Sequence, residues 1–143
     1  MAAFEFWEKA AGLGDIDSTF QLSSVYYQGL GVEHDMKKYI HHLEQAAIGG
    51  HVIARYNLAV MEFGKGNTER TVKHFIIAAN LGHDLSVEKL KEFYAQGGVS
   101  KEDFAAALRG HHAAVDAMKS PQREAAKSSL TVVLEEQCYI NEV

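Results

Sequence analysis

The sequence contains one proline and one cysteine among 143 residues, and each scarcity excludes a class of protein. So little proline excludes collagen-like and proline-rich disordered chains, and it leaves helices free of their strongest breaker. Cys138 has no second cysteine to pair with, so an internally disulfide-stabilised domain is excluded. The lone thiol is either an inert apolar side chain or the site of an occasional intermolecular bridge.

Long apolar runs and an excess of positive charge are also missing. No run approaches the ~20 apolar residues of a membrane-spanning helix, so we expect no membrane insertion. Acidic side chains outnumber Lys and Arg by 19 to 14, the opposite of what binding to phosphates requires, so nucleic acid is not expected as a partner. Glu5 and Glu8 interrupt the first apolar stretch, unlike a secretory signal. With the lone cysteine, this predicts an intracellular, cytoplasmic protein.

What the sequence does contain is a pattern that occurs three times. An alanine pair followed by a glycine begins at Ala10, Ala46 and Ala78. The first pair lies 36 residues before the second, and the second lies 32 residues before the third. A period of this length indicates a repeat protein built from one supersecondary unit.

Each of these glycines is followed by a segment with the spacing of a helix. Steps of four residues place three side chains of each copy on one face, namely Ser18, Leu22 and Tyr26, then Ala54, Leu58 and Glu62, then Ser86, Leu90 and Tyr94. The small residue and the leucine of each set are suited to close packing against a neighbouring helix. We therefore expect these faces to be buried.

A glycine-containing break follows each of these helices, and a second helix is predicted after it. Asp35, Thr68 and Ser100 are the predicted N-caps of the second helices. A large apolar residue stands three positions before each alanine pair, at Trp7, Leu43 and Phe75. The unit is a helical hairpin that cannot bury its apolar stripe alone, so the hairpins are expected to stack.

The stretch from Gly14 to Gly50 resembles a Sel1-like repeat, a relative of the tetratricopeptide repeat. The residues that carry the resemblance are Phe20, Leu22, Tyr26, Gly29, Gly31, Val32, Asp35, Lys38, Ala46 and Ala47. The resemblance covers residues 1–110, although the second copy departs from the pattern with Glu62 in the tyrosine place and a shorter loop. It implies an all-α fold, an α/α superhelix (solenoid) of antiparallel helix pairs, and a protein-interaction adaptor as the function.

The repeat pattern divides the chain into about three repeats with a partial unit at the start. We expect a half repeat, three repeats and a C-terminal capping helix with a frayed tail, at residues 1–14, 15–50, 51–82, 83–119 and 120–143. Pro121 is suited to the first turn of the last helix, predicted over about 121–136 with Ser120 as its cap.

Motifs for catalysis or for ion binding were not found. His41–His42 and His111–His112 are adjacent pairs, and neighbours on a helix point about 100° apart instead of converging on a metal ion. No phosphate-binding glycine loop, nucleophile elbow or cysteine pair accompanies them. We therefore expect no catalytic residues, no metal, no cofactor and no enzymatic activity.

A groove along the first helices is the predicted binding surface. If the small residues and leucines face the core, the stripe one residue earlier in each turn faces a partner. The groove residues predicted in this way are Asp17, Gln21, Ser24, Gln28, Ile53, Asn57, Val60, Leu85, Lys89, Glu92 and Gln96. Amides with a few apolar contacts are suited to an extended peptide. The alternative is that this stripe is the solvated face of three helices.

The first helix offers a second interpretation. Phe4 and Trp7 lie on a second helix whose own first helix is missing, so they are expected to form an exposed apolar edge. That edge favours a structural or oligomerisation module, with the chain a monomer or weak homodimer. A chain that is a piece of a longer repeat array would show the same edge.

Overall fold

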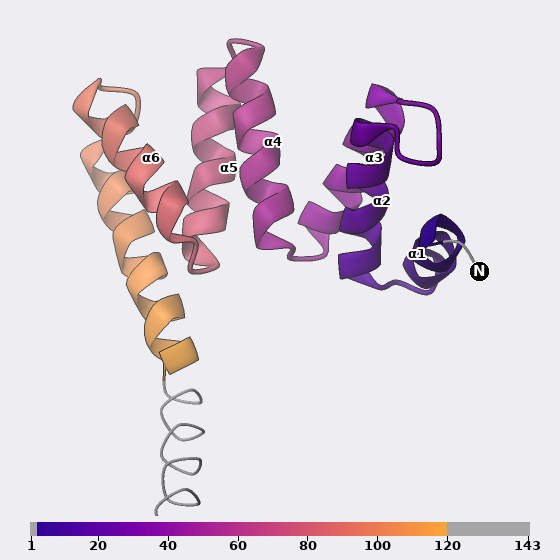
Figure 1. Ribbon diagram of the computed structural model, residues 1–143. Coiled ribbons are helices and arrows are strands. Elements are labelled where there is room, and N and C mark those ends of the chain that lie inside the picture. The colour runs from indigo at the N-terminus through magenta and orange to yellow at the C-terminus, as the bar shows by residue number, and fades with distance from the viewer. Residues whose placement is uncertain (1–2, 120–143) are drawn as a thin grey trace, which may run out of the picture.

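The computed structural model describes residues 3–119, and every regular element within them is a helix. The helices are α1 (Ala3–Gly12), α2 (Ile16–Gln28), α3 (Met36–Ile48), α4 (Val52–Gly64), α5 (Thr68–Asn80), α6 (Asp84–Ala95) and a seventh whose described part is 101–119. Hairpins α2–α3, α4–α5 and α6 with 101–119 follow one another in a row (Figure 1). The predicted all-α solenoid is confirmed. The helix predicted over 121–136 lies outside the described residues.

The buried faces of α2, α4 and α6 are the predicted ones. The first two residues of each predicted set are buried, namely Ser18 and Leu22, Ala54 and Leu58, and Ser86 and Leu90. The closely packed helices among α1 to α6 are pairs that are consecutive in the chain. The core is therefore a series of local interfaces, as expected for stacked hairpins.

The alanine pairs allow these helices to approach closely. Ala46, Ala47, Ala78 and Ala79 are at most 2% exposed, so they take space that larger side chains could not share. The pair in α1, at 10–11, is only half-buried, because α1 packs mainly against α2.

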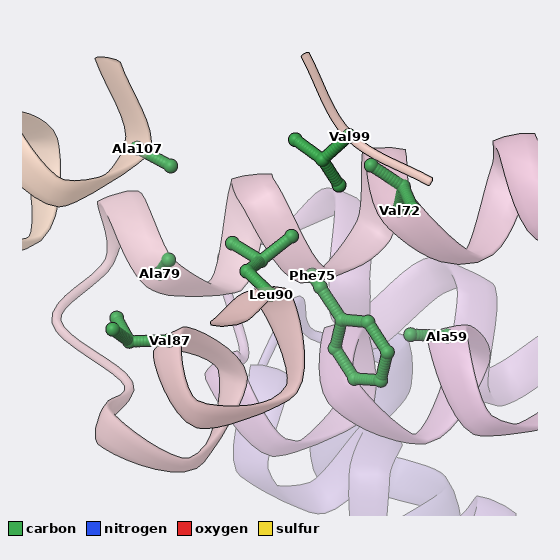
Figure 2. Packing of buried hydrophobic residues seen from close by; sticks show 8 residues of the cluster. All are labelled: Ala59, Val72, Phe75, Ala79, Val87, Leu90, Val99 and Ala107. Atoms are coloured by element: carbon green, nitrogen blue, oxygen red, sulfur yellow. The ribbon is translucent and has the colours of Figure 1, made fainter. Parts of the chain in front are cut away.

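Two clusters of buried side chains form the core. One joins α3 to α4 through Leu43, Ala46, Ala47, Ala54 and Leu58. The other joins α4, α5, α6 and the segment after α6 (Figure 2), and its members are Ala59, Val72, Phe75, Ala79, Val87, Leu90, Val99 and Ala107. Leu43 and Phe75 hold equivalent places in the two clusters, which confirms the predicted role for these two residues, whereas Trp7 is only half-buried.

The glycine after each alanine pair ends the second helix of a hairpin. Gly50 has a φ of 98° and Gly82 has a φ of 92°, in the region that side chains with a Cβ rarely adopt. The next first helix begins two residues after each of them. This turn sets the direction in which each hairpin leaves the previous one.

Two of the three predicted N-caps are confirmed and one is wrong. The Asp35 carboxylate accepts a hydrogen bond from the Lys38 N–H at 3.1 Å, and the Ser100 hydroxyl accepts one from the Asp103 N–H at 3.1 Å. Thr68, however, is the first residue of α5, and Asn67 is its N-cap. Asn67 lies eleven residues before Ala78, as Asp35 lies eleven residues before Ala46, so the observed cap keeps the register of the first repeat and the predicted one was displaced by one residue.

The third position of the core face also differs between repeats. Tyr94 was expected to face the core, but it is 40% exposed and stacks on the ring of Phe104 at 4.8 Å. Tyr26 is half-buried and stacks on His42 at 5.6 Å. The tyrosine place therefore packs against the second helix of its own hairpin and does not reach the centre of the core.

Candidate functional site

Four of the predicted groove residues line one pocket between α4 and α6. They are Val60, Lys89, Glu92 and Gln96, and the pocket has a volume of 310 Å³. Val60 lies on α4, Lys89 and Glu92 lie on α6, and Gln96 is the C-cap residue directly after α6. The structure therefore brings together residues that are up to 36 positions apart in the sequence.

Aromatic side chains form the rest of this pocket, and the sequence analysis missed them as binding residues. They are Tyr56, Phe63, Phe75 and Phe93. The Phe75 ring lies 5.5 Å from that of Tyr56 and 6.1 Å from that of Phe93. Phe63 meets Phe93 edge-to-face at 5.9 Å, a favourable arrangement of aromatic rings. The four rings thus make a continuous apolar wall from α4 through α5 to α6.

The spacing within α4 was the signal that could have identified two of these rings. Tyr56, Val60 and Phe63 stand at positions i, i+4 and i+7, so they share one face of the helix. Val60 was already predicted to face a partner, and its neighbours on the same stripe had to lie beside it. Phe75 was predicted only as a core residue. Its side chain belongs to the core cluster and also lines the pocket.

The charges at the pocket compensate one another. The Lys89 ammonium lies 3.5 Å from the Glu92 carboxylate, one turn further along α6. Such an exposed pair contributes at most about 1 kcal/mol to stability, and it leaves no net charge at this edge. Gln96 adds an amide that can both donate and accept hydrogen bonds.

The other predicted groove residues lie outside this pocket. Gln21 and Gln28 are exposed on α2, and Ser24 is half-buried with its hydroxyl donating to the Phe20 carbonyl at 3.3 Å. Ile53 and Leu85 are exposed apolar side chains, and Asn57 is half-buried. The prediction that they form one binding surface with the pocket stays a prediction.

Asp17 lies instead at the junction between α2 and α4. Its carboxylate is 3.6 Å from Nε2 of His51. His51 is the N-cap of α4, and its Nδ1 accepts a hydrogen bond from the Ala54 N–H at 3.1 Å. The imidazole also stacks on Phe20 at 4.2 Å. Burial lowers the pKa of His51, and the nearby Asp17 opposes that shift. The role of this histidine is therefore to start a helix and seal an interface.

The predicted apolar edge on α1 has a different composition from the one expected. Phe4 is half-buried and meets Tyr26 edge-to-face at 6.0 Å, and Trp7 is also half-buried. The exposed aromatic side chain of α1 is Phe6, at 58%. An oligomer contact at Phe4 and Trp7 stays a prediction, and Phe6 is a better exposed member of the same edge.

Two kinds of site were searched for in the part of the chain that the structure describes. Within residues 3–119, no three side chains of His, Cys, Asp or Glu gather closely enough to hold a metal ion. Among the helices of the same residues, none combines the length and the apolar character needed to cross a membrane.

Comparisons with known proteins point to one family. The Sel1 repeat profile matches residues 1–15, 16–51 and 52–83. An uncharacterised Sel1-like repeat-containing protein of Schizosaccharomyces pombe is 39% identical over 72 residues, which are 47% of this chain and 10% of that protein.

Two solved structures are similar in fold. A Sel1 repeat protein from Oxalobacter formigenes superposes with a TM-score of 0.60 and 25% identity, over 80% of this chain and 49% of that one. A protective antigen of uropathogenic Escherichia coli strains that displays an SLR fold gives a TM-score of 0.59 and 25% identity, over 76% of this chain and 25% of that one. This chain therefore spans between a tenth and about half of the length of these relatives.

Proposed function

We propose that this chain, which belongs to the Sel1 repeat family, is a non-catalytic adaptor that holds an extended segment of a protein partner along α2, α4 and α6. Sel1 repeats generally serve as scaffolds for protein interactions. The observation that carries the proposal is the pocket between α4 and α6, because four residues chosen only for facing a partner line it together.

The composition of the groove supports a peptide as the bound species. Ile53, Val60 and Leu85 are exposed at 44%, 48% and 47%, and Asn57 lies between the first two along α4. Interfaces of this kind combine apolar contacts with hydrogen bonds to an extended main chain. With about three repeats the groove is short, so we expect a modest affinity.

A charge-reversal variant tests this proposal. Lys89→Glu combined with Asn57→Asp places two additional negative charges on the groove, and we expect it to lose partners that the unaltered chain labels by proximity labelling in cells. Lys91→Glu is the matched control, because Lys91 forms the same type of pair with Glu88, at 3.4 Å, within α6. Lys91 is not among the residues that line the pocket. Identical partner lists for all three chains would refute groove binding.

A second candidate function is oligomerisation through α1, supported by the exposed Phe6. In this case Phe6→Glu should abolish a self-association that light scattering detects as the protein concentration rises. A chain that stays monomeric at the highest concentrations would remove this candidate and leave the adaptor. We also propose a cytoplasmic location, supported by the single cysteine.

A further inference from the structure

We infer that the pocket between α4 and α6 is an anchor site for one bulky, uncharged apolar side chain of the bound segment. The inference rests on the proposed function and adds the chemistry of the partner. It assigns the recognition to one place in the groove and predicts what the partner must present there.

The pocket is small, but it is large enough to admit one bulky side chain. Its volume is 310 Å³, at the lower end of the range of about 300–1,000 Å³ that is typical of small-molecule sites. A leucine, methionine or phenylalanine side chain fits within such a space while its main chain stays outside. The main chain can then run along the groove.

The exposed walls of the pocket indicate that something covers them. Phe63 is 59% exposed and Val60 is 48% exposed, and the two stand three residues apart on the same face of α4. Phe63 already contacts Phe93, so its ring is held in place and ready to contact a partner. Adjacent apolar side chains that remain exposed are typical of interaction surfaces.

The charge pattern selects an uncharged occupant. Lys89 and Glu92 neutralise each other, so the edge of the pocket offers no net charge that would attract a charged side chain. A carboxylate or ammonium entering the aromatic pocket would lose its hydration without gaining a full partner, which is costly. The Gln96 amide at the same pocket is suited to hydrogen bonding with the main chain on either side of the anchor.

The probe is a linear peptide of about a dozen residues. It is selected from a displayed library of random peptides for binding to the full chain. We expect the selected peptides to share one bulky apolar residue at a fixed position, and its replacement by alanine to weaken binding roughly tenfold or more. Fluorescence anisotropy with a labelled peptide measures this change.

Two variants of the protein locate the anchor. Val60→Asp should weaken binding of the selected peptide roughly tenfold or more, and the alanine-substituted peptide should lose little further, because the two changes remove the same contact. Ile53→Asp is the comparison variant within the groove, since Ile53 is similarly exposed on the same helix but is not among the residues that line the pocket, and we expect it to weaken binding less than Val60→Asp does. Phe63→Ala removes a wall of the pocket without adding charge, and thermal unfolding of each variant checks the fold.

The possible outcomes separate the anchor from the groove. Equal losses for Val60→Asp and Ile53→Asp, with peptides that tolerate alanine at every position, would overturn the anchor and leave groove binding intact. A selection without binders, or binding that no groove variant changes, would overturn both. Self-association that Val60→Asp removes, in a chain that binds no peptide, would show that the occupant is a second copy, with Phe6 as the candidate side chain.

Discussion

At the scale of single residues, the second repeat shows how one substitution is compensated by another. Lys38 lies 5.2 Å from the centre of the Tyr26 ring in the first repeat, a cation–π contact. In the second repeat Glu62 replaces the tyrosine, and its carboxylate lies 3.6 Å from Nε of Arg70. The Asn67 amide donates a further hydrogen bond to Glu62 at 2.8 Å. Lys38 and Arg70 therefore hold equivalent places in the two repeats, where one contacts an aromatic ring and the other contacts a carboxylate.

Because Arg70 and Asn67 contact the Glu62 carboxylate, removing its charge should lower the free energy of unfolding. The hydrogen bond from Asn67 is the main reason why the pKa of Glu62 is lowered, with Arg70 contributing. Glu62→Gln should reduce the free energy of unfolding by about 1 kcal/mol, measured by urea titration. Glu69→Gln is the control, because the Glu69–Lys73 pair is exposed and its loss should have a much smaller effect on stability. Equal effects of the two changes would contradict a structural role for Glu62.

The sequence alone indicated that Glu62 breaks the pattern but not how it is accommodated. A carboxylate at a position that the pattern predicts to be buried is unfavourable unless partners stabilise its charge, and the sequence does not show those partners. Arg70 and Asn67 lie beyond the glycine break, and their distance from Glu62 depends on the loop. The cap at Asn67, in contrast, could have been predicted by counting back eleven residues from the alanine pair, as for Asp35 in the first repeat.

At the scale of elements, the turn between hairpins is the feature that the sequence predicts best. A glycine after each alanine pair marks the end of a helix, and the first helices begin where the spacing places them. Glycine spacing and helical periodicity are local properties of the chain, so they can be recognised without coordinates. The cap wrongly predicted at Thr68 is the exception.

Gly50 and Gly64 provide a matched pair to test this turn. An added Cβ would meet nothing within 4 Å at either residue, and only Gly50 has a positive φ. Gly50→Ala should therefore destabilise the fold by roughly 1–2 kcal/mol through backbone strain alone. Gly64→Ala, at the end of α4, should be neutral or slightly stabilising. Chemical denaturation of both variants measures the difference, and a neutral Gly50→Ala would mean that the turn is not constrained.

At the scale of the whole molecule, half-buried histidines couple stability to pH. Burial lowers the pKa values of four imidazoles, those of His42, His51, His74 and His83, below 6.5. Unfolding restores the ordinary value, so the unfolded chain binds more protons as the pH falls below about 6.5. Stability is therefore complete at about pH 7.5 and declines as the pH falls through the lowered folded-state values.

We expect the melting temperature to be lower at about pH 5.5 than at about pH 7.5. His51→Asn combined with His83→Asn should flatten this dependence, because asparagine can also cap a helix and does not titrate. A melting temperature that is independent of pH over this range would show that the histidines are accommodated equally well in both protonation states.

Part of the candidate site could be predicted from the sequence, and the rest depends on how the whole array is assembled. Helical spacing identifies which side chains leave the core, and this placed Val60, Lys89, Glu92 and Gln96 together. It does not give the distance between successive first helices. That distance depends on the packing of α5 between α4 and α6, where Phe75 contacts rings of both neighbours. The pocket could therefore be recognised only from the assembled array.

The local character of the packing has a mechanical consequence. Since the close helix contacts among α1 to α6 join consecutive helices, a force applied at the two ends of the array passes through each interface in turn. Under slow stretching with optical tweezers, the hairpins should detach one after another, giving several small extension steps in place of one large rupture.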